Sequence, residues 1–452
     1  MPRDIPVGNG RLLINFDNQY RIRDIYYPRV GGENHSSGHP YRFGVWIENQ
    51  FSWVESDEWQ RSMLYKEDTL VTEVVLKCDR LGVELHCEDT VDFHETIYLR
   101  QIKVINHADH PREVRLFFYH NFHISDFEVG DTAVWYPQLS ALIHYKKMRY
   151  FLINGQNAEG QGISDYATGI KEMAGQEGTY RDAEDDGVLG KNPIAQGSVD
   201  STAALQATVG PGDESIFHYW ICFGTNYHEV EGLNDVVIAK TPTTLIERTT
   251  SYWKLWVKRQ LKAHNLSDSI TELYKRSLLI IRTQMDDGGA IIAANDTDIT
   301  QFNRDTYSYM WPRDGALVAH ALDLAGYPSL SRTFYEFCRP LLTQEGYFLH
   351  KYHSDGSAGS SWHPWLSNGH RQLPIQEDET ALVIWALWEH FKIYGDVDEI
   401  KPLYRELIMR SGVFMADSLH PTSNLPISSY DLWEERHGIH AFTVGAVYAG
   451  II

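Results

Sequence analysis

The hydrophobic pattern of this 452-residue chain changes its period near residue 245, and that change constrains the fold more than any other feature. Residues 83–88 (VELHCE) alternate apolar and polar side chains, as a strand with one buried face does. Residues 114–120 (VRLFFYH) are apolar on both faces, as in an inner strand. Further strand-like runs cover residues 73–77, 98–105 and 217–223. With the turn signals between them, these runs predict a large antiparallel β-sandwich over residues 1–241.

The rest of the chain has a helical period. An amphipathic segment predicts a helical linker over residues 242–266. Capping residues mark the ends of two helices beyond this linker. Asp314 stands before one helix and Gly326 after it, and Gly395 stands after another. Further helices are expected over residues 268–285, 314–325, 330–342, 378–394, 397–419 and 442–452. Long helices joined by aromatic-rich loops predict part of a toroid of helical hairpins over residues 267–452, with the loops forming a site at one end.

The net charge and the composition of the chain make some classes of binding partner improbable. Lys and Arg number 40 against 61 Asp and Glu, a net charge of −21, which disfavours nucleic acid and anionic membranes. No apolar run reaches the roughly 18 residues of a membrane span. The N-terminus lacks a signal-peptide pattern, so we expect a cytoplasmic protein.

The chain has four cysteines: Cys78, Cys87, Cys222 and Cys338. They are too scattered for a disulfide framework or a zinc site, so we expect buried thiols. We also expect no cofactor.

The segment YDLWEER at residues 430–436 carries the sharpest chemical signal. Glu434 and Glu435 are adjacent carboxylates that directly follow Trp433. A carboxyl group against an indole is partly desolvated, which raises its pKa and lets it act as a general acid. The alternative interpretation is an acidic helix N-terminus favoured by the helix dipole.

Two more loops combine polar and aromatic residues before a helix. In YMWPRDG, Arg313 and Asp314 follow Trp311 and offer donors and acceptors suited to adjacent sugar hydroxyls, although a helix cap alone explains Asp314. In the second loop, Trp362 and Trp365 offer flat platforms. That loop runs into a helix start with more polar groups than capping needs: Gln376, Glu377, Asp378 and Glu379.

The three loops should lie at the same end of a helical toroid, and together they predict a carbohydrate site. The sequence contains no Gly-rich phosphate loop and no metal-ligand spacing. His120 and His123, three apart on a strand-like run, are expected on opposite faces and not as a ligand pair.

WPRD at residues 311–314, QED at 376–378 and DLWEE at 431–435 resemble glycoside hydrolase family 15, the glucoamylase family. The N-terminal stretch is similar to the β-sandwich domain of its prokaryotic members. The resemblance implies a β-sandwich, a helical linker and an (α/α)6 barrel of twelve helices. It also implies an enzyme that releases glucose from the non-reducing ends of α-glucans with inversion.

The same resemblance implies roles for individual residues. Glu434 would be the general acid and Glu435 would bind sugar in the neighbouring subsite. Arg313 and Asp314 would grip the non-reducing glucose beside Trp311, and Trp362 or Trp365 would supply the loop aromatic. We also expect Gln376, Asp378 and Trp433 to bind substrate. An inverting glycosidase also needs a second carboxylate as base, roughly 6.5–9.5 Å from the acid. In the family this base lies later in the barrel, so we expect the chain to be a fragment with about half of the barrel and without the base.

Two other functions stay open. A catalytically silent carbohydrate-binding protein would keep Arg313, Asp314 and the tryptophans without turnover. A phosphorylase would need only one acid, but we find no Lys, Arg and Ser cluster near the motifs to hold phosphate. The sequence does not distinguish α-1,4 from α-1,6 linkages or trehalose, and it does not indicate the oligomeric state.

Overall fold

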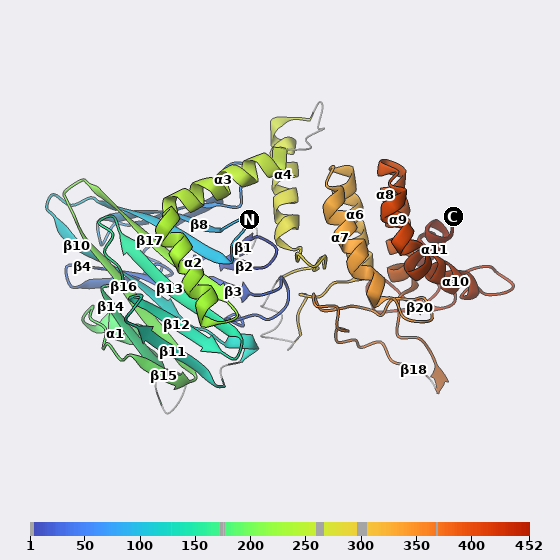
Figure 1. The fold of residues 1–452 in the computed structure, drawn as a ribbon, viewed down its shortest axis with the longest axis horizontal. Helices are drawn as coiled ribbons and strands as arrows, with labels where there is room; N and C mark the ends of the chain where they lie inside the picture. Colours follow the sequence, from blue (N-terminus) through green and yellow to red (C-terminus); the bar gives the residue numbers. More distant parts are fainter. Residues whose placement is uncertain are drawn as a thin grey trace. The chain divides into compact units, whose positions relative to one another are not determined.

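The computed structural model describes residues 4–127, 129–171, 175, 177–258, 266–295, 305–367 and 369–452. The chain divides into two compact units, coloured mostly blue to green and yellow to red (Figure 1). The first unit comprises Met1–Pro28, Glu33–Arg259 and Glu272–Leu279. The second comprises Arg29–Gly32, Gln260–Thr271 and Ile280–Ile452.

The first unit is built from antiparallel strands. One sheet has the order β14-β16-β10-β4-β5, a second has the order β15-β11-β12-β13-β17-β9-β8-β7-β6, and a third has the order β1-β2-β3. The strands are β1 (Asp4–Gly8), β2 (Leu13–Asp17), β3 (Ile22–Tyr26), β4 (Arg42–Ile47), β5 (Gln50–Trp53), β6 (Gln60–Tyr65), β7 (Thr72–Cys78), β8 (Val83–Val91), β9 (Ile97–Asn106), β10 (Arg112–His120), β11 (Asp131–Tyr136), β12 (Ala141–Lys146), β13 (Arg149–Asn157), β14 (Asp165–Ile170), β15 (Ile194–Gly197), β16 (Val199–Val209) and β17 (Glu214–Gly224). A 3₁₀ turn (Ile124–Asp126) and helix α1 (Tyr180–Asp185) connect some of them.

The main core of this unit lies between the five-stranded and nine-stranded sheets. Phe118 of β10 stacks on Tyr219 of β17 with ring centroids 4.3 Å apart, which shows that the two sheets face each other. Strand β8 buries every second residue over its first half, as its alternating sequence requires. All five predicted strand segments lie within β7, β8, β9, β10 and β17, so the antiparallel sandwich is confirmed.

Helices α2 (Tyr227–Lys240) and α3 (Pro242–Lys258) pack on the other face of the nine-stranded sheet (Figure 1). The indole N–H of Trp220 in β17 donates to Asn234 of α2 at 3.0 Å. Helix α2 corrects the expected boundary, because the helical region begins at Tyr227 and not near residue 245. Its few buried apolar side chains, Val230 and Val237, produce a weak periodic signal. The end of the predicted linker, residues 259–265, lies outside the described residues.

The second unit is mainly helical. Helix α4 (Asp268–Thr283) contributes residues to both units. Beyond it lie α6 (Pro312–Leu324), α7 (Pro328–Cys338), a 3₁₀ turn (Arg339–Leu341), α8 (Glu377–Tyr394), α9 (Val397–Leu403), a π-helical turn (Tyr404–Ile408), α10 (Met409–Asp417) and α11 (Ala441–Ile451). Two short hairpins interrupt the helices: β18 (Leu366–Ser367) with β19 (His370–Arg371), and β20 (Ser429–Tyr430) with β21 (His437–Gly438).

Helix α8 packs against both α6 and α11, and its first eight residues are all buried, including the acidic side chains of Glu377, Asp378 and Glu379. Helices α6 and α7 approach closely at Gly315, where an added Cβ would lie 2.4 Å from the ring of Phe334. The inner packing of the unit therefore depends on a helix that is covered on more than one side.

Some predicted helix boundaries are wrong. Asp314 is not the cap of α6, because Trp311 precedes the helix and Pro312 opens it, which places Asp314 inside the first turn. The helix expected over residues 397–419 is divided by the π-helical turn, which follows Pro402, a residue without a backbone N–H. Gly326 and Gly395 do end α6 and α8, with φ of 86° and 69°.

A short segment from the N-terminal region completes the second unit. The backbone N–H of Val30 donates to Asp286 at 3.0 Å, and Arg29 lies 3.3 Å from the same carboxylate. Burial raises the pKa of Asp286 to about 6, although these two groups favour its charged form. The helical unit is therefore discontinuous in sequence.

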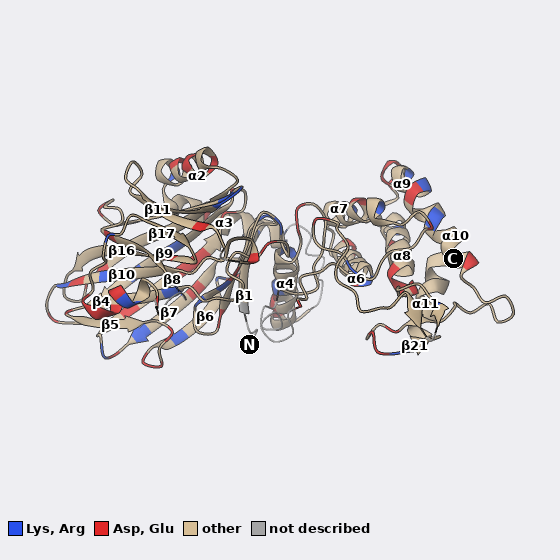
Figure 2. Ribbon diagram, turned by 90° about the horizontal axis from the view of Figure 1, so that it is seen from below, with Lys and Arg blue, Asp and Glu red and all other residues tan. Residues whose placement is uncertain are grey.

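Acidic and basic residues are interspersed in both units (Figure 2). Among the described residues, no helix is long and apolar enough to cross a membrane. All four cysteines are buried and free, as predicted.

Candidate active site

The WPRD segment opens helix α6, and the start of helix α8 holds it in place. The backbone N–H of Arg313 donates to Glu379 at 2.5 Å. The Arg313 guanidinium lies 3.2 Å from Asp378 and 3.2 Å from Glu379. Burial disfavours the charged guanidinium, but the two carboxylates outweigh it and raise the pKa of Arg313. Arg313 therefore stays charged in the interior.

Gln376 and Asp378, predicted to bind sugar, have no exposed surface. Gln376 accepts a hydrogen bond from Arg313. Asp378 pairs with Arg313 and accepts a hydrogen bond from Thr443 of α11 at 3.2 Å. Both side chains turn inward to meet a buried cation and hold Arg313 in place, and their direct contact with sugar stays a prediction.

Arg313 and Asp314 differ in how open they are. The side chain of Arg313 is 7% exposed, whereas that of Asp314 is 49% exposed, and the two groups lie 3.2 Å apart. Asp314 is therefore the member of the pair that is available to a ligand, and Arg313 positions it.

Glu434 lies on the tight loop between β20 and β21. Asp431 shapes this loop, because its carboxylate accepts hydrogen bonds from the backbone of Glu435 and Arg436 at 2.9 and 3.2 Å. Glu434 adopts a left-handed conformation with φ of 64°. Its carboxylate lies 2.6 Å from Nε2 of His350 and accepts a hydrogen bond from the Trp311 indole at 3.2 Å. The structure thus brings Glu434 to Trp311, as the motif analysis expected.

The surroundings of Glu434 correct the expected direction of its pKa. Burial alone raises the pKa of this carboxyl, but hydrogen bonds to His350 and Trp311 lower it below the ordinary value. The indole in contact is that of Trp311, whereas the adjacent Trp433 is 76% exposed. Trp433 directly precedes Glu434 in the chain, but consecutive side chains of a non-helical segment point in different directions.

Two histidines that were not predicted from the sequence, His350 and His363, lie beside Glu434. A two-way backbone bridge joins Met310 to Tyr352, at 2.8 and 2.9 Å, and this bridge sets His350 beside Trp311. His350 and His363 are both buried, with ring centroids 4.2 Å apart. The candidate ligand atoms of His350, His363 and Glu434 all lie within 4.8 Å of one another. Within the part of the chain that the structure describes, this cluster could hold a metal ion.

A buried lysine was also missed. Lys351 is 1% exposed, and its Nζ lies 4.2 Å, 4.5 Å and 5.1 Å from the ring centroids of Trp362, Tyr309 and Trp311. Burial lowers the pKa of Lys351, and the charges of Asp305 and Glu434 oppose that effect. Cation–π contacts of this kind fix the orientation of the three rings. The sequence feature that could have predicted this buried lysine is its position inside the aromatic segment YFLHKYH at residues 347–353.

Aromatic rings and one carboxylate near these loops are open to solvent. Trp362, Trp365 and Trp433 are 54%, 60% and 76% exposed. Glu435 is exposed, in contrast to Glu434. Exposed indoles next to polar groups suit the apolar faces and hydroxyl rims of sugar rings.

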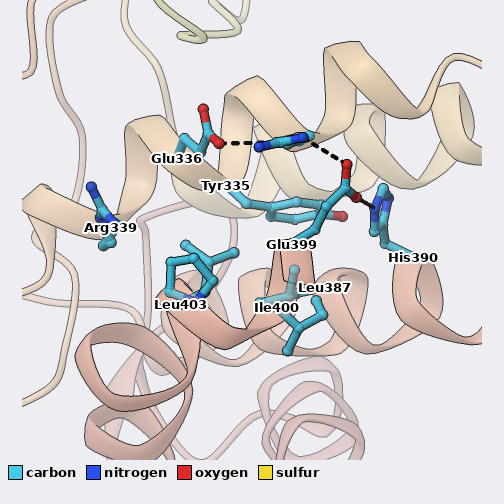
Figure 3. Close-up of a pocket in the computed structure, with 10 residues that line it drawn as sticks. Tyr335, Glu336, Arg339, Leu387, His390, Glu399, Ile400 and Leu403 are labelled. Atoms are coloured by element: carbon cyan, nitrogen blue, oxygen red, sulfur yellow. Dashed lines mark hydrogen bonds and ion pairs between the residues drawn. The ribbon is translucent and has the colours of Figure 1, made fainter. Parts of the chain in front are cut away.

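A separate cavity of about 290 Å³ lies among α7, α8 and α9, and none of the predicted site residues lines it (Figure 3). Glu399 stands between Arg332 and His390, at 2.9 and 3.3 Å. His390 also contacts Asp323 at 2.8 Å, and the two carboxylates raise its pKa against the effect of burial. The charged groups in this cavity therefore satisfy one another, which favours a structural role.

The segment that carries these loops is similar to a known protein family. Residues 270–451 match the family model described as glycosyl hydrolases family 15. The matched region contains every predicted site residue, from Trp311 to Glu435.

One curated relative matches across both units. An uncharacterised glycosyl hydrolase of Methanocaldococcus jannaschii is 25% identical over 457 residues, which cover 98% of this chain and 68% of that protein. The match therefore extends beyond the family 15 region into the β-sandwich.

Two solved structures share the fold. A bacterial glucoamylase complexed with acarbose has a TM-score of 0.72 and 15% identity, over 97% of this chain and 60% of that one. A putative kojibiose phosphorylase from the human microbiome has a TM-score of 0.58 and 8% identity, over 97% of this chain and 59% of that one. The likeness confirms the predicted fold, a β-sandwich followed by helices of an (α/α)6 toroid. The chain spans about three fifths of the length of both solved proteins.

Proposed function

We propose that this chain is part of a glucoamylase-type glycosidase that releases glucose from non-reducing ends of α-glucans with inversion, and that Glu434 is its general acid. The observation that carries the proposal is the position of Glu434. Its side chain is 10% exposed and accepts a hydrogen bond from the indole of Trp311, on the segment that presents Asp314. The match of residues 270–451 to the glycosyl hydrolases family 15 model supports glycosidase chemistry.

In the proposed reaction Glu434 gives its proton to the glycosidic oxygen while water attacks the anomeric carbon from the opposite side. The hydrogen bonds around Glu434 favour its charged form in the free chain. A bound sugar ring displaces water from the carboxyl group, which favours the protonated form that an acid needs. Asp314 binds hydroxyl groups of the terminal glucose, and Trp362 supplies a stacking face. Glu435 and Trp433 bind the neighbouring sugar.

Water attack needs a second carboxylate as base. The expectation that this base is not among these residues stays a prediction, and glucose release by the chain tests it. Maltose, isomaltose and trehalose are offered separately, and the anomer released is followed by NMR. A general acid contributes roughly 10²–10⁴-fold to the rate, so Glu434→Gln should remove any release that the chain shows. Glu435→Gln, one residue away, should affect KM more than kcat.

Binding keeps the proposal testable if the chain releases no glucose. Calorimetry with acarbose should show binding that Asp314→Asn weakens at least tenfold. Absence of binding to acarbose and to all three disaccharides contradicts the proposal, and so does equal glucose release by the Glu434→Gln variant. Binding without release under any condition agrees both with the predicted lack of the base and with the silent carbohydrate-binding alternative. Release that requires inorganic phosphate supports the phosphorylase alternative.

A further inference from the structure

His350, His363 and Glu434 form a compact cluster whose composition differs from a sugar-binding surface. The two imidazoles are 1% and 4% exposed, and the Glu434 side chain is 10% exposed. Their candidate ligand atoms lie within 4.8 Å of one another. Two imidazoles and a carboxylate are a common zinc ligand set, whereas calcium and magnesium prefer oxygen ligands alone.

Ser361 orients both rings. Its hydroxyl oxygen lies 3.1 Å from Nδ1 of His350 and 3.4 Å from Nδ1 of His363. Metal-bound histidines usually direct their second ring nitrogen to such a partner, which fixes the tautomer and the ring plane. With Nδ1 turned to Ser361, Nε2 of His363 is left for another ligand, whereas Nε2 of His350 already meets the Glu434 carboxylate at 2.6 Å and the Trp311 indole N–H at 3.2 Å.

Two buried polar atoms of the cluster lack a partner. Among the described residues, neither Nε2 of His363 nor Oε2 of Glu434 has a hydrogen-bond partner, and both atoms are buried. Buried polar atoms in native proteins are almost always paired, so such a pair of atoms in one cluster indicates a missing ligand.

We propose that Nε2 of His350, Nε2 of His363 and the carboxylate of Glu434 bind a zinc ion, with water as the fourth ligand. Tetrahedral zinc with bonds of about 2.0–2.2 Å separates its ligands by about 3.3 Å. His350 Nε2 and Glu434 Oε1 are now 2.6 Å apart, and all candidate ligand atoms lie within 4.8 Å of one another, so shifts of up to about 1.5 Å bring the three ligands to the ion.

Zinc in this position occupies the carboxylate that the proposed reaction uses as its acid, so zinc inhibits that reaction. Only this inhibition rests on the proposed function. The binding of zinc stands on the geometry of the cluster and is measured without any substrate.

The test titrates the chelator-treated chain with zinc chloride in a calorimeter, with cobalt(II) as a spectroscopic probe. His363→Phe keeps a ring of similar shape and removes the nitrogen. Calorimetry of this variant should show one zinc ion fewer per chain, or a zinc affinity that is at least tenfold lower. The variant should also lack the visible absorption of tetrahedral cobalt. His370→Ala is the matched control, because His370 is exposed on β19 of the same loop and should bind zinc as the unchanged chain does.

Equal zinc stoichiometry and affinity in the unchanged chain and in His363→Phe overturns the proposal, as does the absence of tetrahedral cobalt absorption in the unchanged chain. If circular dichroism shows that His363→Phe is unfolded, Glu434→Gln replaces it under the same criteria. Loss of zinc binding in that variant supports the site, and retention overturns it.

Discussion

Glu377, in the first turn of helix α8, is the residue whose replacement should most change the pH dependence of stability. It is 2% exposed, and among the described residues neither of its carboxyl oxygens has a hydrogen-bond partner. Burial, with a further contribution from Asp378, raises the pKa of Glu377 to about 8. The folded chain therefore holds a proton that the unfolded chain releases above about pH 4.5.

This difference has a definite sign. Because the folded-state pKa is raised, the stability linked to Glu377 is fully present below about pH 4.5 and is lost as the pH rises to about 8. Each pH unit in that window costs about 1.4 kcal/mol, so the loss reaches about 3 kcal/mol at pH 7. Glu377→Gln keeps the size of the side chain but cannot ionise. The variant should therefore exceed the unchanged chain in free energy of unfolding by an amount that grows with pH.

Urea unfolding at pH 5, 6 and 7, followed by tryptophan fluorescence, measures this difference. We expect an advantage of under about 1 kcal/mol at pH 5 and about 3 kcal/mol at pH 7. Glu345→Gln, at an exposed position, is the control and should show no such trend. An advantage that does not change with pH, or a variant that is less stable than the unchanged chain at pH 7, refutes the reasoning.

Other substitutions test the packing of the helical unit. Arg313→Ala leaves Asp378 and Glu379 buried without their cation, and should lower the free energy of unfolding by about 3–5 kcal/mol in urea titrations. An unchanged unfolding midpoint would show that this cluster is not structural. Gly289→Ala should destabilise by more than about 1 kcal/mol, because Gly289 has φ of 103° and an added Cβ lies 2.2 Å from a carbonyl oxygen. In calorimetry Gly412→Ala, with nothing within 4 Å, should retain or raise the Tm, and an equal loss in both variants would contradict the steric argument.

Local patterns were enough for most of the fold. The alternation of residues 83–88 depends only on one buried face, and it places β8 correctly. Gly395 ends α8 because a left-handed residue is needed there, and this requirement is local too. Helix α2 was missed because tertiary contact with Trp220, and not its own weak pattern, stabilises it.

The site was harder to predict because its chemistry depends on contacts between distant segments. Glu434 meets His350, 84 positions earlier in the chain, and that contact reverses the expected direction of its pKa. Asp378 carried the right chemistry for sugar binding, but its partner Arg313 turns it into the interior. His363 stood within a segment chosen for its tryptophans, and nothing local indicated that its ring faces Glu434.

The discontinuity of the helical unit bears on how the chain is made. Val30 leaves the ribosome before its partner Asp286, which lies 256 positions later. At synthesis rates of roughly 5–20 residues per second, the segment waits roughly 10–50 s for that partner. When the helices of the second unit are synthesised, the segment Arg29–Gly32 that contacts them has therefore already been made. A gene fragment that begins at α4 would encode the described helices of the second unit but not Val30, whose backbone N–H donates to Asp286.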